Sequence, residues 1–324
     1  MLLDLGLTSE TPASEFIKMF KLAEKGGFNC LWIGEDLEKP YDIFVQASIA
    51  LLRTSLKVGT GITSIYFRNI TNIARAAAGL HEIGRNRFRL GIGVGGIQAL
   101  KKLGISPRKP LSAMREATFL LRKIWNGETI TFKSEKFQLK NYYPRFGLKQ
   151  KIPIFFGVRG LKMLELAGEI ADGVILSGPK TYLQKAIEIV KTNARKAGRT
   201  ENDVNLIVWI PTILISKREE LEFAREVVTV VLADTPRNVL NMSKIDVEAV
   251  MEIKNTLKRG LNIAARLVTE EMLNDVVFYG DPQELCSSMR SLEKYGINEI
   301  VFGPPFGINK ENAISKIART WRRN

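Results

Sequence analysis

Residues 87–96 read RFRLGIGVGG, a short apolar segment that ends abruptly in glycines. Residues 58–66, VGTGITSIY, have the same form earlier in the chain. Strands that are buried on both faces read as nearly continuous apolar runs, and α/β barrels carry their ligand sites at the carboxyl ends of such strands. The two segments therefore predict parallel strands whose tips face a ligand.

Working outward from these segments, short apolar runs alternate with amphipathic ones along the chain. The expected strands are residues 2–7, 30–33, 56–59, 88–93, 153–156, 173–176, 206–215 and 299–302. The expected helices are residues 14–25, 43–52, 70–83, 111–125, 161–170 and 181–196, with another that starts at Asp281-Pro282. Eight parallel strands joined by helical crossovers predict an α/β fold, a (β/α)8 TIM barrel with insertions.

The length of 324 residues suits one barrel domain over residues 1–324, since α/β barrels reach this size as a single domain. Two insertions are expected. Residues 129–139 alternate apolar and polar side chains, which predicts an exposed hairpin near 128–147. Residues 219–275 are mostly helical in pattern and longer than one crossover requires, which predicts a helical insertion.

Composition excludes several classes of protein. No stretch is long and apolar enough to cross a bilayer, and the N-terminus lacks a secretory signal, so a cytoplasmic protein without a membrane partner is expected. Cys30 and Cys286 form no CxxC motif. The net charge is +14, but the basic residues are spread along the chain with acidic ones between them. This favours a basic surface that attracts an anionic cofactor over a nucleic-acid partner.

A Rossmann fold competes for the glycine-rich segment. Gly91, Gly93 and Gly96 satisfy the G-x-G-x-x-G spacing, and Glu116 follows where a ribose-binding acid could stand. That acid should end a second strand, whereas the residues around Glu116 have a helical pattern. Pro107 and Pro110 also interrupt the helix that would have to bind the dinucleotide. The barrel is the favoured interpretation.

The chemistry is limited by the side chains that the chain lacks. His81 is the one histidine, and it lies near the end of the third expected helix, on the side of a barrel opposite the active site. A Ser-His-Asp triad and a histidine-bound metal are therefore not expected, and no metal site is predicted. A bound organic cofactor most easily explains an enzyme of this composition.

Several segments together resemble the bacterial luciferase-like oxidoreductases: residues 27–33, 58–63, 87–93, 125–128 and 166–175. Within that superfamily the chain is similar to the branch that uses the deazaflavin coenzyme F420, typified by methylenetetrahydromethanopterin reductase. The resemblance covers nearly the whole chain. It implies hydride transfer between coenzyme F420 and a small-molecule substrate, in a homodimer or higher homo-oligomer. An FMN-dependent monooxygenase or reductase, and a non-catalytic flavin-binding barrel, are the alternatives.

The resemblance also implies which residues hold the coenzyme. In the family the third strand ends in a bulge, often with a non-prolyl cis peptide, which here would be Gly61-Ile62; a simple tight glycine turn is the other interpretation. After the fourth strand, the backbone would approach the coenzyme ring closely. After the fifth and sixth strands, helix starts would bind the coenzyme's phosphate. The implied set is Thr60, Gly61, Ile62, Thr63, Gly93, Gly95, Gly96, Gly157, Val158, Arg159, Ser177, Gly178 and Lys180.

Glu35 and Asp36 are adjacent carboxylates directly after the second strand, and they are the candidate catalytic residues. The family usually has an acidic residue followed by histidine there, so Asp36 stands where an imidazole is expected. Glu35 would then supply the like charge that lets an aspartate hold a proton near neutral pH. The alternative is that the pair caps the following loop. Residues 5–9, LGLTS, also lack the glutamate that the pterin reductases carry near the first strand's tip, which implies a different electrophile.

Overall fold

The computed structural model describes residues 1–215 and 217–323 of the chain. Eight of its strands close into a parallel barrel in the order β12, β1, β2, β3, β5, β8, β9 and β10, and β10 pairs back with β12. The barrel strands are β1 (Leu2–Thr8), β2 (Cys30–Gly34), β3 (Lys57–Thr60), β5 (Phe88–Gly93), β8 (Ile154–Gly157), β9 (Gly173–Leu176), β10 (Asn205–Leu214) and β12 (Glu299–Phe306). The predicted TIM barrel is confirmed.

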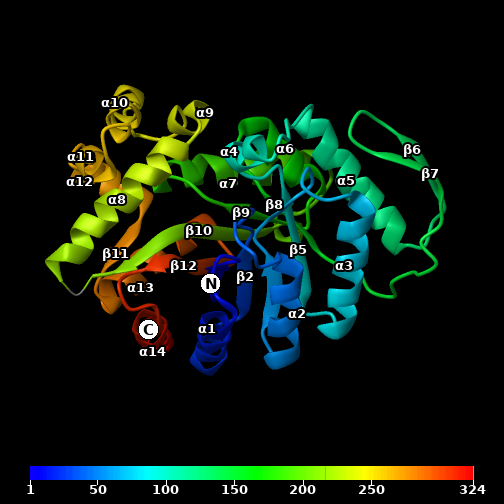
Figure 1. Cartoon of the computed structure of the whole chain (residues 1–324), viewed down its shortest axis with the longest axis horizontal. Helices are drawn as coiled ribbons and strands as arrows, with labels where there is room; N and C mark the ends of the chain where they lie inside the picture. The colour runs from blue at the N-terminus through cyan, green and yellow to red at the C-terminus, as the bar shows by residue number, and fades with distance from the viewer. Residues whose placement is uncertain (216, 324) are drawn as a thin grey trace.

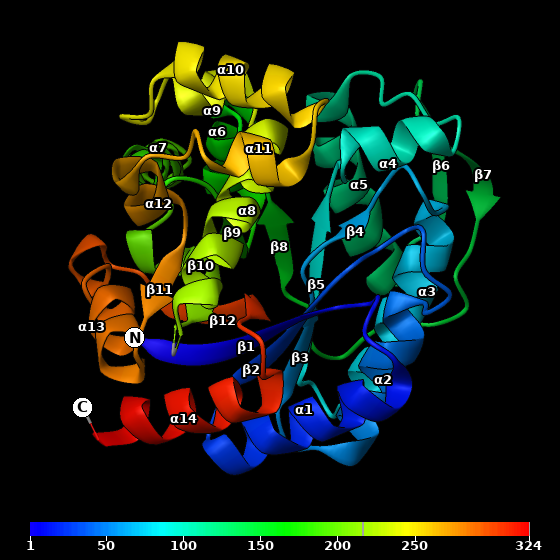
Figure 2. The same cartoon turned by 60° about the vertical axis from the view of Figure 1, so that its left-hand side comes forward.

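Helices surround the barrel (Figure 1). Those between barrel strands are α1 (Ala13–Gly26), α2 (Ile43–Arg53), α3 (Ile70–Ile83), α4 (Ile97–Lys102), α5 (Pro110–Trp125), α6 (Leu161–Ile170), α7 (Lys180–Lys196) and α13 (Pro282–Arg290), and α14 (Lys310–Arg323) follows the last strand. Two short 3-10 helices span Glu201–Asp203 and Glu293–Tyr295. In Figure 2, α1 and α14 lie side by side, on the side of the molecule away from α10 and α11.

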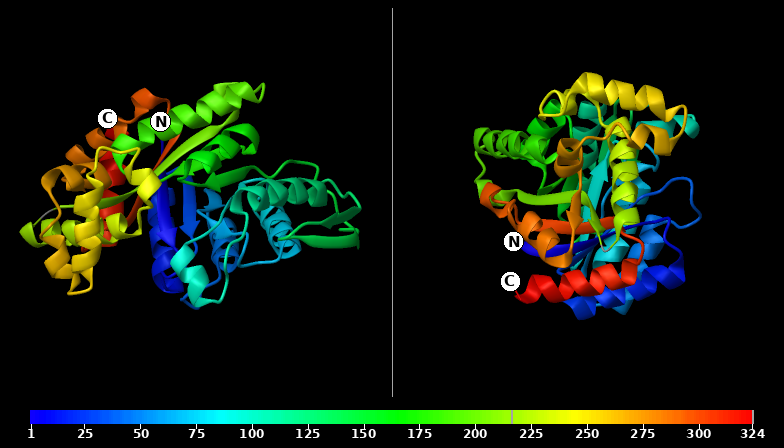
Figure 3. Two further views of the ribbon diagram at one scale, coloured as in Figure 1. Left: turned by 90° about the horizontal axis from the view of Figure 1, so that it is seen from above. Right: turned by 90° about the vertical axis from the view of Figure 1, so that its left-hand side faces the viewer.

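Two groups of elements lie outside the regular alternation. Strands β6 (Ile130–Lys133) and β7 (Gln138–Tyr142) form an antiparallel hairpin. The chain between β10 and the short strand β11 (Phe278–Gly280) forms α8 (Arg218–Asp234), α9 (Arg237–Leu240), α10 (Val247–Leu257), α11 (Leu261–Ala265) and α12 (Glu270–Val276). Seen from above, the hairpin and these helices lie at opposite ends of the molecule (Figure 3). Throughout the described residues, each helix is too short or too polar to span a bilayer.

The third barrel strand is interrupted by a bulge at the position where the resemblance implied one. It is divided into β3 and the two-residue strand β4 (Thr63–Ser64), with Gly61 and Ile62 between them. Strand β3 pairs with β5 only as far as Gly59, and β4 resumes the pairing with β5 at Thr63. The chain therefore bulges away from β5 at the point where the sequence shows its first glycine-rich tip.

Aromatic and aliphatic side chains pack together inside the barrel, and glycines make room for the aromatic rings. Trp32 is fully buried and packs edge-to-face on Phe155, with ring centroids 5.1 Å apart. A Cβ atom on Gly59 would lie 2.3 Å from the Trp32 ring, and one on Gly6 would lie 2.5 Å from the ring of Trp209. Part of the glycine content of these strands is therefore explained by packing of the protein's own indole rings.

Candidate active site

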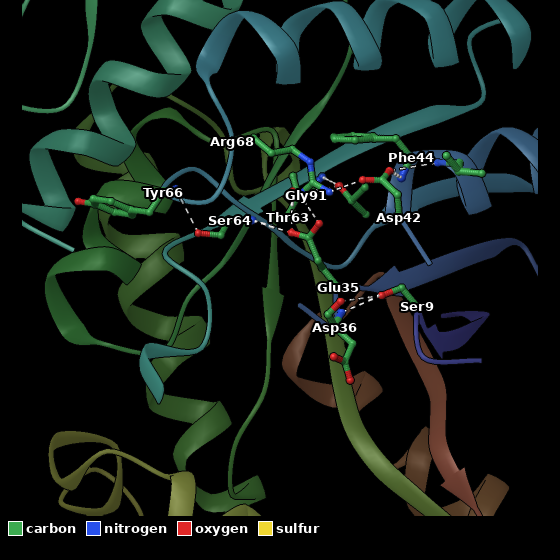
Figure 4. Close-up of polar contacts among 12 residues, drawn as sticks. Ser9, Glu35, Asp36, Asp42, Phe44, Thr63, Ser64, Tyr66, Arg68 and Gly91 are labelled. Carbon is green, nitrogen blue, oxygen red and sulfur yellow. Dashed lines mark hydrogen bonds and ion pairs between the residues drawn. The ribbon is translucent and has the colours of Figure 1, made fainter. Parts of the chain in front are cut away.

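The candidate site lies where the carboxyl ends of β2, β3 and β5 meet (Figure 4). Glu35 follows the last residue of β2, and the Gly61-Ile62 bulge follows β3. The Gly61-Ile62 peptide bond is cis, as the resemblance implied. The backbone N–H of Gly61 donates to the carbonyl of Ile33 at 2.6 Å, which fixes the bulge against β2.

Thr60 replaces the hydrogen bonds that the bulge removes from the sheet. Its Oγ1 donates to the carbonyl of Gly91 at 2.7 Å and accepts from the N–H of the same residue at 2.8 Å. Thr60 is fully buried. Its hydroxyl is therefore committed to joining β3 to β5, behind the surface that a ligand would contact.

Ile62 is held as an apolar surface at the barrel mouth. A Cβ atom on Gly157 would lie 2.5 Å from its Cγ2, and one on Gly93 would lie 3.0 Å from its Cδ1. Both glycines thus make space for the Ile62 side chain, which remains partly exposed. The resemblance implies close approach of a coenzyme at Gly93 and a phosphate-binding helix start at Gly157, and in the structure both glycines also make space for Ile62.

Glu35 is the most enclosed carboxylate of this site, with 5% of its side chain exposed. Its Oε2 accepts from Thr63 Oγ1 at 2.9 Å and from the backbone N–H of Ser64 at 3.3 Å. Its Oε1 forms an ion pair with Arg68. Burial raises the pKa of Glu35 above its usual value, although Arg68 and the hydrogen bonds from Thr63 and Ser64 act in the opposite direction. A carboxyl group of this kind keeps its proton to higher pH than an exposed one.

Asp36 is separated from this network. Its carboxylate accepts from the backbone N–H of Glu38 at 2.8 Å, and its own N–H donates to Ser9 Oγ at 2.8 Å. In Figure 4 its carboxylate points away from that of Glu35. The expected pairing of two carboxylates is not the arrangement found. Asp36 caps the loop, while Glu35 faces the network.

The loops after β5 and β8 approach the same mouth. Gly95 has a φ of +93° and packs on Ser64, where a Cβ atom would lie 2.9 Å away. Gly96 is exposed and precedes α4 without a side-chain cap. After β8, Val158 is buried, and Arg159 forms an ion pair with Asp234 of α8 at 3.3 Å.

The loop after β9 leads into α7. Gly178 has a φ of +149°, which a side chain rarely adopts, and Ser177 precedes it, half-buried. The Lys180 amine donates to the Asn274 carbonyl at 2.6 Å and lies 4.4 Å from the centre of the Phe278 ring. Burial lowers the pKa of Lys180 to about 8, against the opposing charge of Asp275. In this structure Lys180 therefore contacts α12 rather than an open phosphate position.

Three residues of the site were missed by sequence reasoning. Arg68 contacts Glu35, and Asp42 contacts Arg68 at 2.6 Å. Tyr182 Oη donates to the Arg159 carbonyl at 2.6 Å and so fixes the loop after β8 against α7. Arg68 stands just before Asn69, the N-cap of α3, and Asp42 is the N-cap of α2. Both residues lie between a strand end and the next helix, at or directly before the residue that caps that helix. This position in the sequence is the signal that could have identified them.

The arrangement combines an apolar surface with a proton-holding group. Ile62 presents the apolar surface, and Glu35 is connected to the adjacent residue, Thr63, by a hydrogen bond. No group of three or more histidine, cysteine, aspartate or glutamate residues that could hold a metal occurs within residues 1–215 and 217–323. The described side chains therefore combine an apolar surface with a buried acid at the barrel mouth.

Known proteins give the family of the chain. The sequence model of the luciferase-like monooxygenase family matches residues 3–299. A 5,10-methylenetetrahydromethanopterin reductase of Methanolobus tindarius is 30% identical over 314 residues, which cover 95% of each chain. The enzyme of the same name from Archaeoglobus fulgidus is 30% identical over 308 residues, or 92% of each chain.

Solved structures agree on the fold. The coenzyme F420 dependent tetrahydromethanopterin reductase from Methanopyrus kandleri superimposes with a TM-score of 0.90 at 24% identity, covering 99% of this chain and 98% of that one. An F420-dependent secondary alcohol dehydrogenase superimposes with a TM-score of 0.80 at 19% identity, covering 98% and 97%. The predicted superfamily is confirmed, as is the likeness to methylenetetrahydromethanopterin reductase. The chain belongs to the luciferase-like monooxygenase family.

Proposed function

We propose that this chain is an oxidoreductase that transfers hydride between coenzyme F420 and a small organic substrate. Two methylenetetrahydromethanopterin reductases that are 30% identical over at least 92% of both chains support it. The observation that carries the proposal is the buried Glu35 carboxylate, joined through Thr63 to the Ile62 bulge. We infer from it a proton-holding group beside an apolar surface at the barrel mouth.

The described residues fit a deazaflavin coenzyme. Ile62, wedged against Gly93 and Gly157, offers the kind of apolar surface on which a flat ring packs. Helix α6 begins after Gly160 with no side-chain cap on its first N–H groups, and Arg159 directly precedes Gly160. Uncapped helix N-termini bind phosphate groups. Gly157 to Gly160 would therefore hold the phosphate, and Ile62 would support the ring.

The protein's own contribution is orientation and proton supply. When bound and reduced, the coenzyme supplies the hydride. Hydride addition leaves an electron pair on a heteroatom of the substrate, which must then take up a proton. We assign that proton to Glu35, whose burial raises its pKa and so keeps the carboxyl protonated to higher pH. Thr63 and the Ser64 amide hold the carboxyl in place.

The residues at the tip of β1 indicate which substrate the protein prefers. Thr8 and Ser9 stand where the resemblance implied a glutamate in the pterin reductases, and buried Ser9 is hydrogen-bonded to the backbone of Asp36. We therefore propose an electrophile other than methylenetetrahydromethanopterin as the preferred substrate, with the pterin as the reference compound. The family resemblance also supports a cytoplasmic homodimer or higher homo-oligomer as the working form.

Coenzyme titration tests the proposal. Purified protein is titrated with coenzyme F420 and, separately, with FMN while coenzyme fluorescence and absorbance are followed. We expect binding of F420, and reoxidation of the reduced coenzyme when an electrophilic substrate such as the pterin or a ketone is added. Tight binding of FMN alone would reject the coenzyme assignment. Binding of a coenzyme without turnover of any acceptor would favour a binding protein.

Variants of the two adjacent carboxylates then test the proton assignment. Glu35→Gln removes the proton donor, so it should lower kcat by about 10²- to 10⁴-fold, the usual contribution of a general acid, with little change in F420 affinity. Asp36→Asn is the matched comparison, and its effect should be much smaller because its carboxylate caps the loop at Glu38. Equal losses in the two variants would contradict the assignment to Glu35.

A further inference from the structure

Arg68 occupies an unusual position for an arginine near a protein surface. It follows β4 and precedes α3, and only 13% of its side chain is exposed. Its guanidinium carbon lies 5.1 Å from the centre of the Phe44 ring and 4.7 Å from that of Phe67. Two aromatic rings therefore contact the guanidinium beside its carboxylate partners and restrict its movement.

One end of the guanidinium is anchored on α2. Arg68 Nη2 lies 2.6 Å from Asp42 Oδ2, and Oδ1 of the same carboxylate accepts from the backbone N–H groups of Phe44 at 2.8 Å and Val45 at 3.3 Å. Asp42 is the N-cap of α2, so it is held by the helix start as well as by the ion pair. Arg68 is thus tied to a rigid element rather than to another flexible side chain.

The other end of the guanidinium contacts the proposed acid. Arg68 Nη1 forms the ion pair with Glu35 Oε1 and donates to Thr63 Oγ1 at 3.2 Å, while Thr63 in turn donates to Glu35. Figure 4 shows Arg68 between the two carboxylates. Arginine suits this bridge, because its planar fork bonds two partners at once, whereas lysine is a point charge.

We infer that Arg68 is a positioning residue for Glu35, holding the carboxyl at one place and setting the pH at which it releases its proton. The inference rests on the proposed role of Glu35 but concerns a different residue. Burial favours the neutral form of Glu35 and Arg68 favours the charged form. Of the charged side chains described, Arg68 contacts Glu35 directly, and Asp42 and Asp36 lie beyond those contacts. Removing the Arg68 charge leaves burial opposed by the hydrogen bonds from Thr63 and Ser64 alone.

The first test reads Glu35 directly and needs no coenzyme. Glutamate carboxyl carbons are labelled with ¹³C, and the Glu35 resonance is assigned by its loss in Glu35→Gln. In Arg68→Gln the titration of Glu35 should move toward higher pH by about one pH unit or more, since a neighbouring opposite charge usually has an effect of this size. Arg68→Lys should restore most of the wild-type titration. An unchanged titration in folded Arg68→Gln would overturn the inference.

A matched control separates this effect from loss of any arginine. Arg115 forms an exposed ion pair with Glu169 at 2.6 Å on the outside of the barrel, between α5 and α6. Arg115→Gln should leave the Glu35 titration where it is. If Arg68→Gln does not fold, the wild-type Arg68 guanidinium ¹⁵N resonance is followed instead. It should titrate together with Glu35 and stay constant in Glu35→Gln, and a resonance that is constant in the wild type contradicts the inference.

Turnover provides the second readout. In an active preparation, Arg68→Gln should lower kcat by up to about 100-fold, as expected for a misplaced catalytic group, and move the alkaline limb of the pH profile to higher pH. A uniform loss at all pH values, with no movement of that limb, would indicate a merely structural role and reject the inference. Failure of wild-type protein to bind or oxidise the coenzyme rejects the proposed function instead, and leaves the NMR result as the test of Arg68.

Discussion

At the scale of single residues, the glycine-rich tips serve the protein's own packing as well as the site. Gly91 is the example with the least space. A Cβ atom there would lie 1.9 Å from the Thr60 carbonyl oxygen, which is part of the backbone. Thr60 cannot retreat, because its hydroxyl forms two hydrogen bonds to Gly91 itself. The joint between β3 and β5 therefore requires glycine at this position.

A pair of glycine-to-alanine substitutions checks this. Gly91→Ala should lower the free energy of unfolding by about 3 kcal/mol or more, at the upper end of the range for overpacking. Gly79→Ala is the control, because Gly79 lies inside α3 with no atom within 4 Å of the added Cβ. It should raise that free energy by about 0.5 to 1 kcal/mol, since alanine favours a helix interior. Urea unfolding measures both, and similar values for the two variants would refute the packing argument.

At the scale of elements, helix α3 carries the chain's one histidine at the end remote from the site. His81 is 5% exposed, and among the described residues neither ring nitrogen has a hydrogen-bond partner. Burial lowers the pKa of His81. The unfolded chain then binds a proton at a pH where the folded protein does not. The free energy of unfolding should fall as pH drops from the usual histidine value of about 6.5 through the lowered value.

Replacing the imidazole tests this pH dependence. In His81→Leu the part of the acid destabilisation that comes from His81 should disappear, so the difference in unfolding free energy between variant and wild type should grow as pH falls below about 6.5. Glu82→Gln is the matched control, because Glu82 is the exposed neighbour of His81 on the same helix. Chemical unfolding across the pH range gives both curves. A constant difference between His81→Leu and wild type would exclude a contribution of His81.

At the scale of the whole molecule, a buried polar network joins opposite sides of the barrel at the end away from the site. Glu299 at the start of β12 forms an ion pair with Arg89 of β5 at 2.7 Å, with the two side chains 2% and 11% exposed. Asp4 of β1 accepts from Trp32 Nε1 at 2.8 Å. Burial, followed by the neighbouring Glu299, raises the pKa of Asp4 well above its usual value, so Asp4 holds a proton beside the charged Glu299.

Breaking this network should be costly. Arg89→Met leaves Glu299 buried without its cation and should lower the free energy of unfolding by about 3 to 5 kcal/mol. Asp4→Asn keeps a donor for Glu299 and should cost less. In the wild type, the raised pKa of Asp4 predicts that the free energy of unfolding falls as pH rises through that pKa. Asp4→Asn should remove this pH dependence. Thermal and urea unfolding of both variants measure this, and a larger loss in Asp4→Asn would contradict the assignment of the proton.

The sequence by itself determined the eight barrel strands, most of the helices that join them and the place of Glu35. Apolar runs and helical periodicity are local properties, and Glu35 follows a strand directly along the chain, so barrel topology alone puts it at the mouth. Only the tertiary structure decided which partners Glu35 has and which way Asp36 points. Arg68 reaches Glu35 from a different loop, and Thr60 meets Gly91 across the bulge. Such contacts depend on strand register and barrel closure, which bring distant residues together and which no local pattern encodes.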